Sequence, residues 1–496
     1  MSLKLRAVVI GWIVMAAVGC GTRGTSDSPY LRSDGGAPSD GGGRRDANFV
    51  SPPPGDTSDT DHDGLSDADE INVYFTDPTQ RDSDGDGITD LGEVAAGADP
   101  NDASSRISDS DFFVVLPYNG EHQIKSLHFG TNIQVADVFF LIDDTGSMQS
   151  AIDHVNSSMR DIASQVHALI PDVQFGVGSY EDFPIGSYGM RDSVLTFRSR
   201  DDWPFHLDQM ITDDLDAVND ALALTAEGGS DTPESSIEAL YQTATGAGVG
   251  YEGGSVPPAT CPYAPDDFAP RVGYPCFRPG ALPIVVLVTD APFHNGPGGT
   301  NAYDRSSVPN AHSFDDAALA LNSIGARFIG VDLDAALEDE SAMAIATGSV
   351  DPAGYPLVYM GTATSTAERI VTGITSLVGR TPQDVGAVAR NVAGNPDDFD
   401  ARVFIKSIAP VEGYNGSASG PMPGITYASH DDTTFYQVIP GTSVEFSIDF
   451  WNDARPPGVT AQVFKANIVV VGNSVATLDV RTAYIIVPSE GGIVLL

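Results

Sequence analysis

Apolar runs that end in a carboxylate are the feature that most constrains the fold. "ADVFFLID" at 136–143 and "PIVVLVTD" at 283–290 are apolar for most of their length and close with Asp143 and Asp290. Runs of this kind, separated by helix-period patterns, are typical of parallel strands that are buried on both faces. Ligands of such sheets bind at the carboxyl ends of the strands. We therefore expect both aspartates to lie at one rim of one sheet.

The same alternation of apolar runs and helix-period patterns extends from residue 131 to 382. Further strand-like runs are "VQFGVGSY" (173–180), "SVLTFRS" (193–199), "ARFIGVDL" (326–333) and "PLVYM" (356–360), and helical patterns cover 148–169, 214–224, 234–245, 313–324 and 363–379. Strands that alternate with helices predict an α/β domain, Rossmann-like, with a mainly parallel sheet flanked by helices.

The turn after the first run carries oxygen ligands at alternate positions. Asp143, Thr145 and Ser147 can place one carboxylate and two hydroxyls around a hard cation as the next helix begins. Mg²⁺ prefers six oxygens and accepts water among them, which leaves a coordination position open. A helix N-cap is the simpler alternative for these residue types.

Two more loops carry acids in the same region. "GGSDTPE" (228–234) precedes a helical pattern, and "TDAPFH" (289–294) follows an apolar run. With "LIDDTGSM" (141–148) and "GVGSYEDF" (176–183), these segments resemble the metal loops of von Willebrand factor type A domains, and more narrowly those of the inserted domain of integrin β subunits. The resemblance covers about half the chain.

This resemblance implies two cation sites. A primary Mg²⁺ (or Mn²⁺) adhesion site would use Asp143, Thr145, Ser147, Thr232, Glu234 and Asp290. A second site, for Ca²⁺, would use Asp182, Asp231, the carbonyl of Pro233 and Glu234. Gly229 stands where the family has an asparagine ligand, and Ser150 and Ala151 replace the acidic pair of a third site, which we expect to be absent. We expect His294 to be a loop residue or to lie behind the ligands rather than touch the metal.

Two acidic repeats precede this region. "DTDHDGLSDADE" (59–70) and "DSDGDGITDLGE" (82–93) both fit D-x-D-x-D-G-x-x-D-x-x-E, the ligand spacing of a Ca²⁺ loop. The predicted ligands are Asp59, Asp61, Asp63, Leu65 (carbonyl), Asp67 and Glu70 in the first loop, and Asp82, Asp84, Asp86, Ile88 (carbonyl), Asp90 and Glu93 in the second. With "TDP" and "ADPND" after the loops, residues 59–103 resemble bacterial thrombospondin type 3 repeats, which implies a calcium-stiffened stalk rather than a sensor.

The N-terminus predicts export. Basic residues and the apolar run "AVVIGWIVMAAVG" precede Cys20, so residues 1–19 are typical of a signal peptide. "AAVGC" resembles a bacterial lipoprotein signal, which implies a lipid on Cys20 and a place at the outer membrane or cell surface; a plain secretory signal is the alternative. Residues 20–58 are rich in Gly, Ser, Asp and Pro and predict a disordered tether. Cys261 and Cys276 then remain, and we expect them to form a disulfide in an oxidising compartment.

The last part of the chain has only strand-like patterns. "VEFSIDFWND", "AQVFKANIVVVG" and "TAYIIVP" predict an all-β sandwich over residues 383–496. "DFFVVLPYNG", within 104–130, is also strand-like and could complete that sandwich, with the α/β domain inserted between. Independent stacking of the two domains is the alternative.

The charge balance and the missing motifs narrow the function. With 25 Lys and Arg against 68 Asp and Glu, the formal charge is −43, which disfavours nucleic acid as a partner. The chain carries no P-loop, nucleophile elbow or catalytic Cys–His pattern, so we expect a binding protein rather than an enzyme. The resemblance implies an envelope-anchored, metal-dependent adhesion protein whose partner offers a carboxylate. A structural scaffold whose metals only stabilise loops is the main alternative, and a metal-dependent hydrolase is a weaker one.

Overall fold

The computed structural model describes residues 58–488, apart from 106–110, 192–199, 263, 265–266, 416–421, 424–426 and 459–460. The predicted signal peptide, Cys20 and nearly all of the predicted tether lie outside the described residues, as does the predicted strand at 193–199. Among the residues that are described, no helix is both long enough and apolar enough to cross a membrane.

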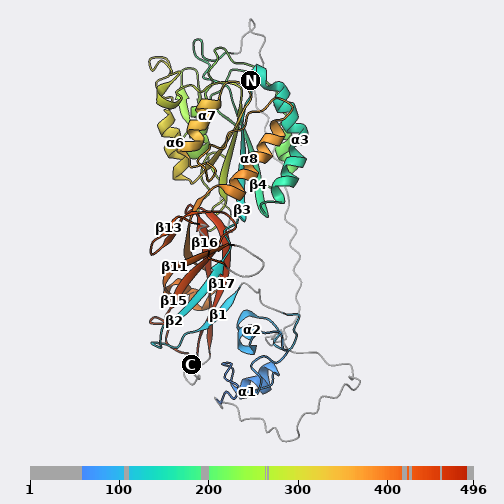
Figure 1. Ribbon diagram of the computed structural model, residues 1–496, viewed down its shortest axis with the longest axis vertical. Coiled ribbons are helices and arrows are strands. Elements are labelled where there is room, and N and C mark those ends of the chain that lie inside the picture. Colours follow the sequence, from blue (N-terminus) through green and yellow to red (C-terminus); the bar gives the residue numbers. More distant parts are fainter. Residues whose placement is uncertain are drawn as a thin grey trace, which may run out of the picture. The chain divides into compact units, whose positions relative to one another are not determined.

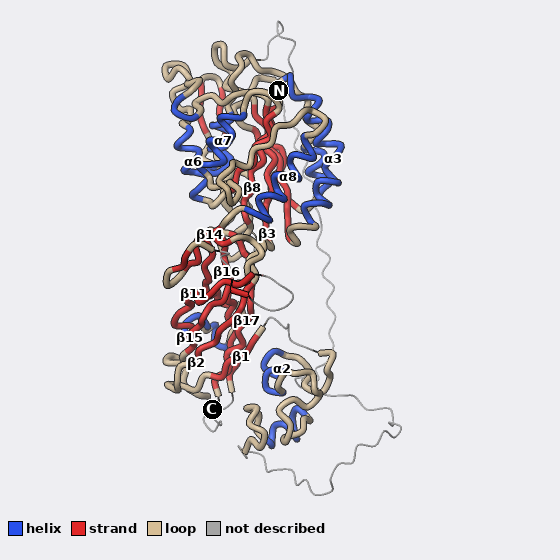
Figure 2. The backbone as a smooth tube through the Cα atoms, in the orientation of Figure 1, coloured by secondary structure: helices blue, strands red, loops and turns tan. Residues whose placement is uncertain are grey.

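A five-stranded sheet forms the centre of the α/β domain (Figure 2). Its order is β5 (His206–Thr212), β4 (Asp172–Tyr180), β3 (Val135–Asp143), β8 (Leu282–Thr289) and β9 (Arg327–Asp332). All neighbours pair in parallel except β5, which runs antiparallel to β4 at the edge. The mainly parallel α/β sheet predicted from the sequence is therefore present, with β3 in the middle of it.

Helices cover both faces of this sheet. One face holds α3 (Gln149–His167), α4 (Leu215–Ala221) and α8 (Thr366–Arg380), and the other holds α5 (Ser236–Thr245), α6 (Phe314–Ser323) and α7 (Leu337–Ala346). Figure 1 shows α3 and α8 on one side of the strands and α6 and α7 on the other. Successive β3 residues point to opposite faces, so Phe140 packs in the first core and Phe139 in the second. Burial on both faces explains why the run is apolar for most of its length.

Three elements of this domain differ from the sequence prediction. Helix α7 was not predicted, because "LEDESAMAIA" begins with acids and its apolar residues do not form one clear stripe. Strand β5 was not predicted, since it is an edge strand whose residues are mostly half-buried or exposed. The predicted strand 356–360 is wrong: the segment forms only isolated bridges, including one between Val358 and Gly330.

Two further sheets gather strands from both sides of the α/β segment. The six-stranded sheet has the order β1 (Phe112–Val115), β17 (Ala476–Val487), β16 (Gln462–Gly472), β10 (Gln383–Asn391), β14 (Thr434–Val438) and β13 (Ser429–His430). The four-stranded sheet has the order β12 (Met422–Pro423), β11 (Ile405–Asn415), β15 (Ser443–Phe450) and β2 (Gln123–Phe129).

Aromatic side chains join these two sheets face to face. Phe112 meets Phe450 with ring centroids 5.9 Å apart, and Phe435 meets Phe446 at 5.4 Å. Because β1 pairs with β17 and β2 pairs with β15, the chain leaves this pair of sheets after β2 and re-enters it at β10. The segment at 104–130 thus supplies strands to the C-terminal sheets. In the sequence, the α/β domain lies between this segment and the remaining strands of those sheets.

The acidic repeats form short helices after each loop. The first loop leads into α1 (Asp67–Asp69) and the π-helical turn η1 (Glu70–Tyr74), and the second leads into α2 (Asp90–Ala96). Ser66 and Thr89 cap α1 and α2 by accepting bonds from backbone N–H groups. The backbone N–H of Leu91 donates to Asp63 Oδ2 at 2.9 Å, which ties the second repeat to the first.

The connection from α5 to β8 carries the disulfide. It contains the hairpin β6 (Val249–Tyr251) and β7 (Gly254–Val256), and Cys261 and Cys276 are bonded with Cα atoms 5.4 Å apart. Arg278 follows the bridge and binds the fully buried Asp137 of β3, with its Nε 2.7 Å from Oδ1 and its backbone N 2.6 Å from Oδ2. The loop is thus fastened to the start of β3 by an ion pair.

We expect Arg278→Ala to lower the free energy of unfolding of the α/β domain by about 3–5 kcal/mol, because it leaves the Asp137 carboxylate buried without its partner. Arg160→Ala is the control, since its bond to Asp216 joins two exposed side chains of the same domain. That change should cost about 1 kcal/mol or less. Urea unfolding of both variants measures the difference, and equal losses would contradict an anchoring role for the Arg278 pair.

Candidate metal centre

Three neighbouring strands deliver acids to one rim. Asp143 ends β3, Asp182 lies two residues beyond β4, and Asp290 directly follows β8. The registers place Asp143 beside Tyr180 and Ile142 beside Val288, so the three strands end level with one another. The structure therefore brings these predicted ligands to the carboxyl edge of the sheet.

Asp143 is buried and held in a fixed orientation. Its Oδ1 accepts bonds from the backbone N–H (3.0 Å) and the hydroxyl (2.7 Å) of Thr145, and its Oδ2 accepts one from the hydroxyl of Thr289 (2.6 Å). Burial raises the pKa of Asp143 to about 6, against the lowering effect of these donors. The nearby charge of Asp290 raises this pKa further. The carboxyl group is thus positioned precisely while its ionised form is disfavoured.

Glu234 approaches the same turn from the loop before α5. Its backbone N–H donates to Pro292 O at 3.0 Å and its carbonyl accepts from His294 N at 2.8 Å, so two rim loops are tied together. Glu234 is only 3% exposed, and its Oε2 has no hydrogen-bond partner among the residues that the structure describes. Burial, followed by the charges of Asp143 and Asp182, raises the pKa of Glu234 to about 12.

Gly229 explains how this loop can come so close. Its φ is +76°, and a Cβ at this position would lie 3.2 Å from Glu234 Oε1 and 3.4 Å from Thr145 Cβ. The family's asparagine would therefore be both strained and crowded here. Glycine lets Glu234 and Thr145 approach each other, and it offers no side-chain oxygen to the rim.

The other predicted ligands of the primary site are more open. Ser147 is exposed, with its Oγ 3.5 Å from Thr145 Oγ1. Asp290 is half-buried, and Thr232 is exposed on the loop that carries Glu234. Asp143, Thr145 and Glu234 are thus the buried members, or floor, of the predicted site, and Ser147, Asp290 and Thr232 are its more accessible members.

A second cluster contains a residue that we did not expect as a ligand. Asp182, Asp231 and His294 have ligand atoms that all lie within 4.8 Å of one another. His294 Nε2 is 3.2 Å from Asp182 Oδ2 and 3.4 Å from Asp231 Oδ2. Burial lowers the pKa of His294, but its interactions with Asp182 outweigh that effect and raise the pKa overall.

Several residues of the rim were missed by sequence reasoning. Thr289 and Tyr303 donate to Asp143 and Asp182, but no spacing rule links them to those acids. Arg200 binds Asp144 Oδ2 at 2.6 Å and Glu181 Oε2 at 2.5 Å, which places a cation behind the carboxylates. The only sequence signal for Arg200 was that it is a basic residue in a strongly acidic region.

The two calcium loops fold in the same way. The first three acids of each loop form a cluster, Asp59, Asp61 and Asp63 in one and Asp82, Asp84 and Asp86 in the other. Asp67 and Asp90 accept bonds from Thr60 and Ser83 instead, so each carboxylate braces the start of its own loop. Glu70 and Glu93 are fully buried, and burial together with neighbouring acids raises their pKa values to about 9 and about 8.

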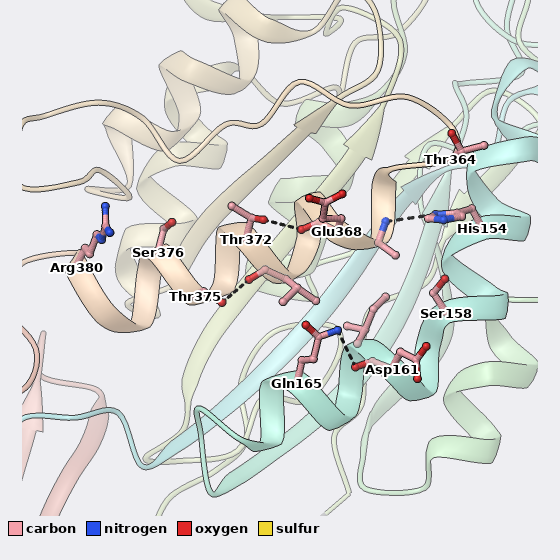
Figure 3. Close-up of a pocket in the computed structure, with 13 residues that line it drawn as sticks. His154, Ser158, Asp161, Gln165, Thr364, Glu368, Thr372, Thr375, Ser376 and Arg380 are labelled. Atoms are coloured by element: carbon pink, nitrogen blue, oxygen red, sulfur yellow. Dashed lines mark hydrogen bonds between the residues drawn. The ribbon is translucent and has the colours of Figure 1, made fainter.

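A groove elsewhere in the domain has a different character. It lies between α3 and α8, has a volume of about 700 Å³, and is lined by polar side chains such as His154, Asp161, Glu368 and Arg380 (Figure 3). None of the predicted metal ligands lines this groove. The chemistry of the rim is thus separate from this pocket.

We expect Glu234→Gln to stabilise the metal-free protein at pH 7 by about 3 kcal/mol. The folded state holds Glu234 protonated while the unfolded chain ionises it near pH 4.5, so this group destabilises the fold increasingly as pH rises between those two pKa values. Urea unfolding in chelator measures this effect. Between pH 7 and pH 8 the free energy of unfolding of the parent should fall by about 1.4 kcal/mol, and the variant should lack this fall. Glu338→Gln, a change at an exposed acid, should keep the pH dependence of the parent's stability. The same pH dependence in Glu234→Gln would contradict a protonated Glu234 in the folded state.

Calcium binding to the repeats should release protons at pH 7. Glu70 and Glu93 are protonated in the metal-free loops because their pKa values lie above 7, and a Ca²⁺ ligand must be ionised. Calorimetric titration in two buffers of different protonation enthalpy measures the release, and Glu70→Gln should reduce it by about one proton per chain. Asp69→Asn is the control at an exposed neighbouring acid, and a proton count that Glu70→Gln leaves unchanged would contradict the prediction.

Comparison with known proteins supports part of this description. Residues 59–80 and 82–103 each match the family model described as "Bacterial TSP3 repeat". This match, with the acidic clusters of the loops, supports a calcium-binding repeat type. No curated protein matches the chain.

Solved structures give only distant likenesses. A von Willebrand factor type A protein from Catenulispora acidiphila is 14% identical, with a TM-score of 0.29 over 76% of this chain and 72% of that one. The pilus adhesin SpaC from Lactobacillus rhamnosus GG is 11% identical, with a TM-score of 0.30 over 74% of this chain and 45% of that one. Proximal thread matrix protein 1 from the mussel byssus is 14% identical, with a TM-score of 0.29 over 53% and 50%.

Proposed function

We propose that the α/β domain is a von Willebrand factor A-type domain that binds a protein partner through a Mg²⁺ (or Mn²⁺) ion at the rim. One observation supports this most strongly. Glu234 Oε2 is buried beside the oriented carboxylate of Asp143 and has no hydrogen-bond partner among the described residues, so the site needs a proton or a cation at this position.

The residues at the rim suit Mg²⁺ chemically. Asp143, Thr145, Ser147, Thr232, Glu234 and Asp290 offer only oxygen atoms, which is the donor set that Mg²⁺ and Mn²⁺ prefer. When bound, the ion supplies a coordination position that a partner's carboxylate can fill. The protein's own part is to hold Asp143 in one orientation through Thr145 and Thr289, and to keep the buried floor dry.

The remaining parts of the chain define how the domain is presented. We infer that the two acidic repeats are a spacer stiffened by Ca²⁺, and that the C-terminal sheets with β1 and β2 are a β-sandwich that supports the inserted domain. The N-terminal sequence supports an exported protein anchored by a lipid on Cys20, at the outer membrane or cell surface. In this proposal the protein binds and does not catalyse, and nucleic acid is not a partner.

Thermal unfolding tests the Mg²⁺ site directly. In the full chain with its loops saturated by Ca²⁺, Mg²⁺ at ten times its dissociation constant should stabilise the domain by about 1.4 kcal/mol. Asp143→Ala should abolish this response, whereas the exposed change Asp220→Ala should keep it. If neither Mg²⁺ nor Mn²⁺ at millimolar concentration raises the unfolding temperature of the parent, the proposed mechanism is wrong.

A binding assay separates adhesion from the alternatives. Immobilised parent protein should retain acidic proteins or cell surfaces in Mg²⁺ and release them in chelator, and Asp143→Ala should retain none. Retention that is indifferent to metal would instead favour a structural scaffold. Turnover of a bound substrate would favour a metal-dependent hydrolase.

A further inference from the structure

The cluster of Asp182, Asp231 and His294 does not have the chemistry of a calcium site. The resemblance assigned oxygen ligands to this position, but Gly229 supplies no side-chain oxygen and His294 directs a ring nitrogen at the two carboxylates. Ca²⁺ takes oxygen ligands almost exclusively, whereas imidazole suits Zn²⁺ and other divalent transition metals. The chain therefore departs from the pattern that it otherwise resembles.

The hydrogen bond of the other ring nitrogen orients His294. Nδ1 lies 2.6 Å from the carbonyl oxygen of Asn301, and a carbonyl can only accept, so Nδ1 carries the proton. In the neutral ring, Nε2 then presents its lone pair to the cluster. Histidine ligands of metals are commonly oriented by such a bond from the second nitrogen to a carbonyl or carboxylate.

The ring is also fixed by packing. His294 is 3% exposed, stacks on Tyr303 with centroids 4.1 Å apart, and meets the edge of Tyr188 at 5.2 Å. Its Nε2 makes no hydrogen bond of good geometry among the described residues. A buried nitrogen is thus aimed at two acids, which are the polar groups recorded close to it.

The two carboxylate oxygens of Asp182 have different neighbours. Its Oδ1 accepts bonds from the Tyr303 hydroxyl and from the backbone N–H of Phe183, whereas its Oδ2 faces His294 and has no other donor in the described part of the chain. Asp182 is fully buried, and Asp231 stays about one-third exposed. The cluster therefore has a buried side fixed by other residues and one side that solvent and ions can reach.

The spacing of the atoms fits a small ion. Two ligands with bonds of 2.0–2.1 Å in a tetrahedral zinc site are roughly 3.3 Å apart. The nitrogen of His294 lies 3.2 and 3.4 Å from the two carboxylate oxygens. Without a proton or metal between them, a lone pair and two carboxylates at this spacing would repel one another.

We propose that Asp182, Asp231 and His294 bind one divalent transition-metal ion, such as Zn²⁺ or Co²⁺, in preference to Ca²⁺, beside the Mg²⁺ site. The site has three protein ligands, so water completes the coordination. The proposal goes beyond the adhesion function and does not depend on it, because it requires no partner at Asp143.

Titration of the full chain with Co²⁺ tests the proposal. With the repeats saturated by Ca²⁺ and Mg²⁺ present, one equivalent of Co²⁺ should produce the visible absorption of a nitrogen-ligated ion, and Zn²⁺ should displace it. His294→Gln should weaken Co²⁺ binding at least about 100-fold, since changes even to the groups that orient metal ligands cost about 10–100-fold. Asp231→Asn, at a partly exposed ligand, should weaken binding as well with little risk to folding.

Two controls distinguish this site from others. His312→Gln alters another half-buried histidine, which binds Glu238, and should leave the Co²⁺ signal unchanged. Asp143→Ala should abolish the Mg²⁺ response but keep Co²⁺ binding, so failure of one site is separable from failure of the other. Co²⁺ binding that survives both His294→Gln and Asp231→Asn, displacement by millimolar Ca²⁺, or no binding at all would overturn the proposal. In the last case a protonated His294 is itself the cation that neutralises the two acids.

Discussion

The burial of carboxylates at the ends of parallel strands is the constraint on which the rest of the α/β domain depends. Asp143, Asp182 and Glu234 are nearly or fully inaccessible, and burial raises the pKa of each. Each therefore needs donors, a positive charge or a proton in its surroundings. Asp143 accepts hydrogen bonds from the hydroxyls of Thr145 and Thr289. Asp182 accepts one from the hydroxyl of Tyr303. The neighbouring Asp144 forms an ion pair with Arg200. Among the described residues Glu234 has no such donor at Oε2, so a proton occupies this position in the metal-free protein and a bound cation would have to replace it.

The sequence predicted the parts of this arrangement that follow from periodicity. Continuous apolar runs identified β3, β4, β8 and β9, and because parallel strands end at one edge, the meeting of Asp143 and Asp290 at one rim followed directly. The repeat spacing likewise predicted the acidic clusters of both loops, where the family model matches. The assignments of bound metals, partner and lipid anchor remain predictions.

Other features depend on tertiary contacts that no local pattern encodes. His294 was expected to be a loop residue or to lie behind the ligands, because one histidine in a loop says nothing about which acids it meets. Its position depends on the bond from His294 N to Glu234 O and on the ring of Tyr303, both of which come from elsewhere in the chain. Similarly, Asp67 and Asp90 match the ligand spacing, but in the fold they bind Thr60 and Ser83.

The strand exchange described above also determines the order in which the chain can fold. Strand β2 pairs with β15, and β1 pairs with β17, across a separation in sequence that includes the whole α/β domain. Contacts so distant in sequence form slowly, and they cannot form before the last strands have been made. The α/β domain has all its strands within one continuous segment and one core of its own, so it can fold first, whereas its other core continues into the C-terminal sheets. Until β15 and β17 have been made, β1 and β2 lack their partner strands, and unpaired strand edges are templates for pairing with other chains.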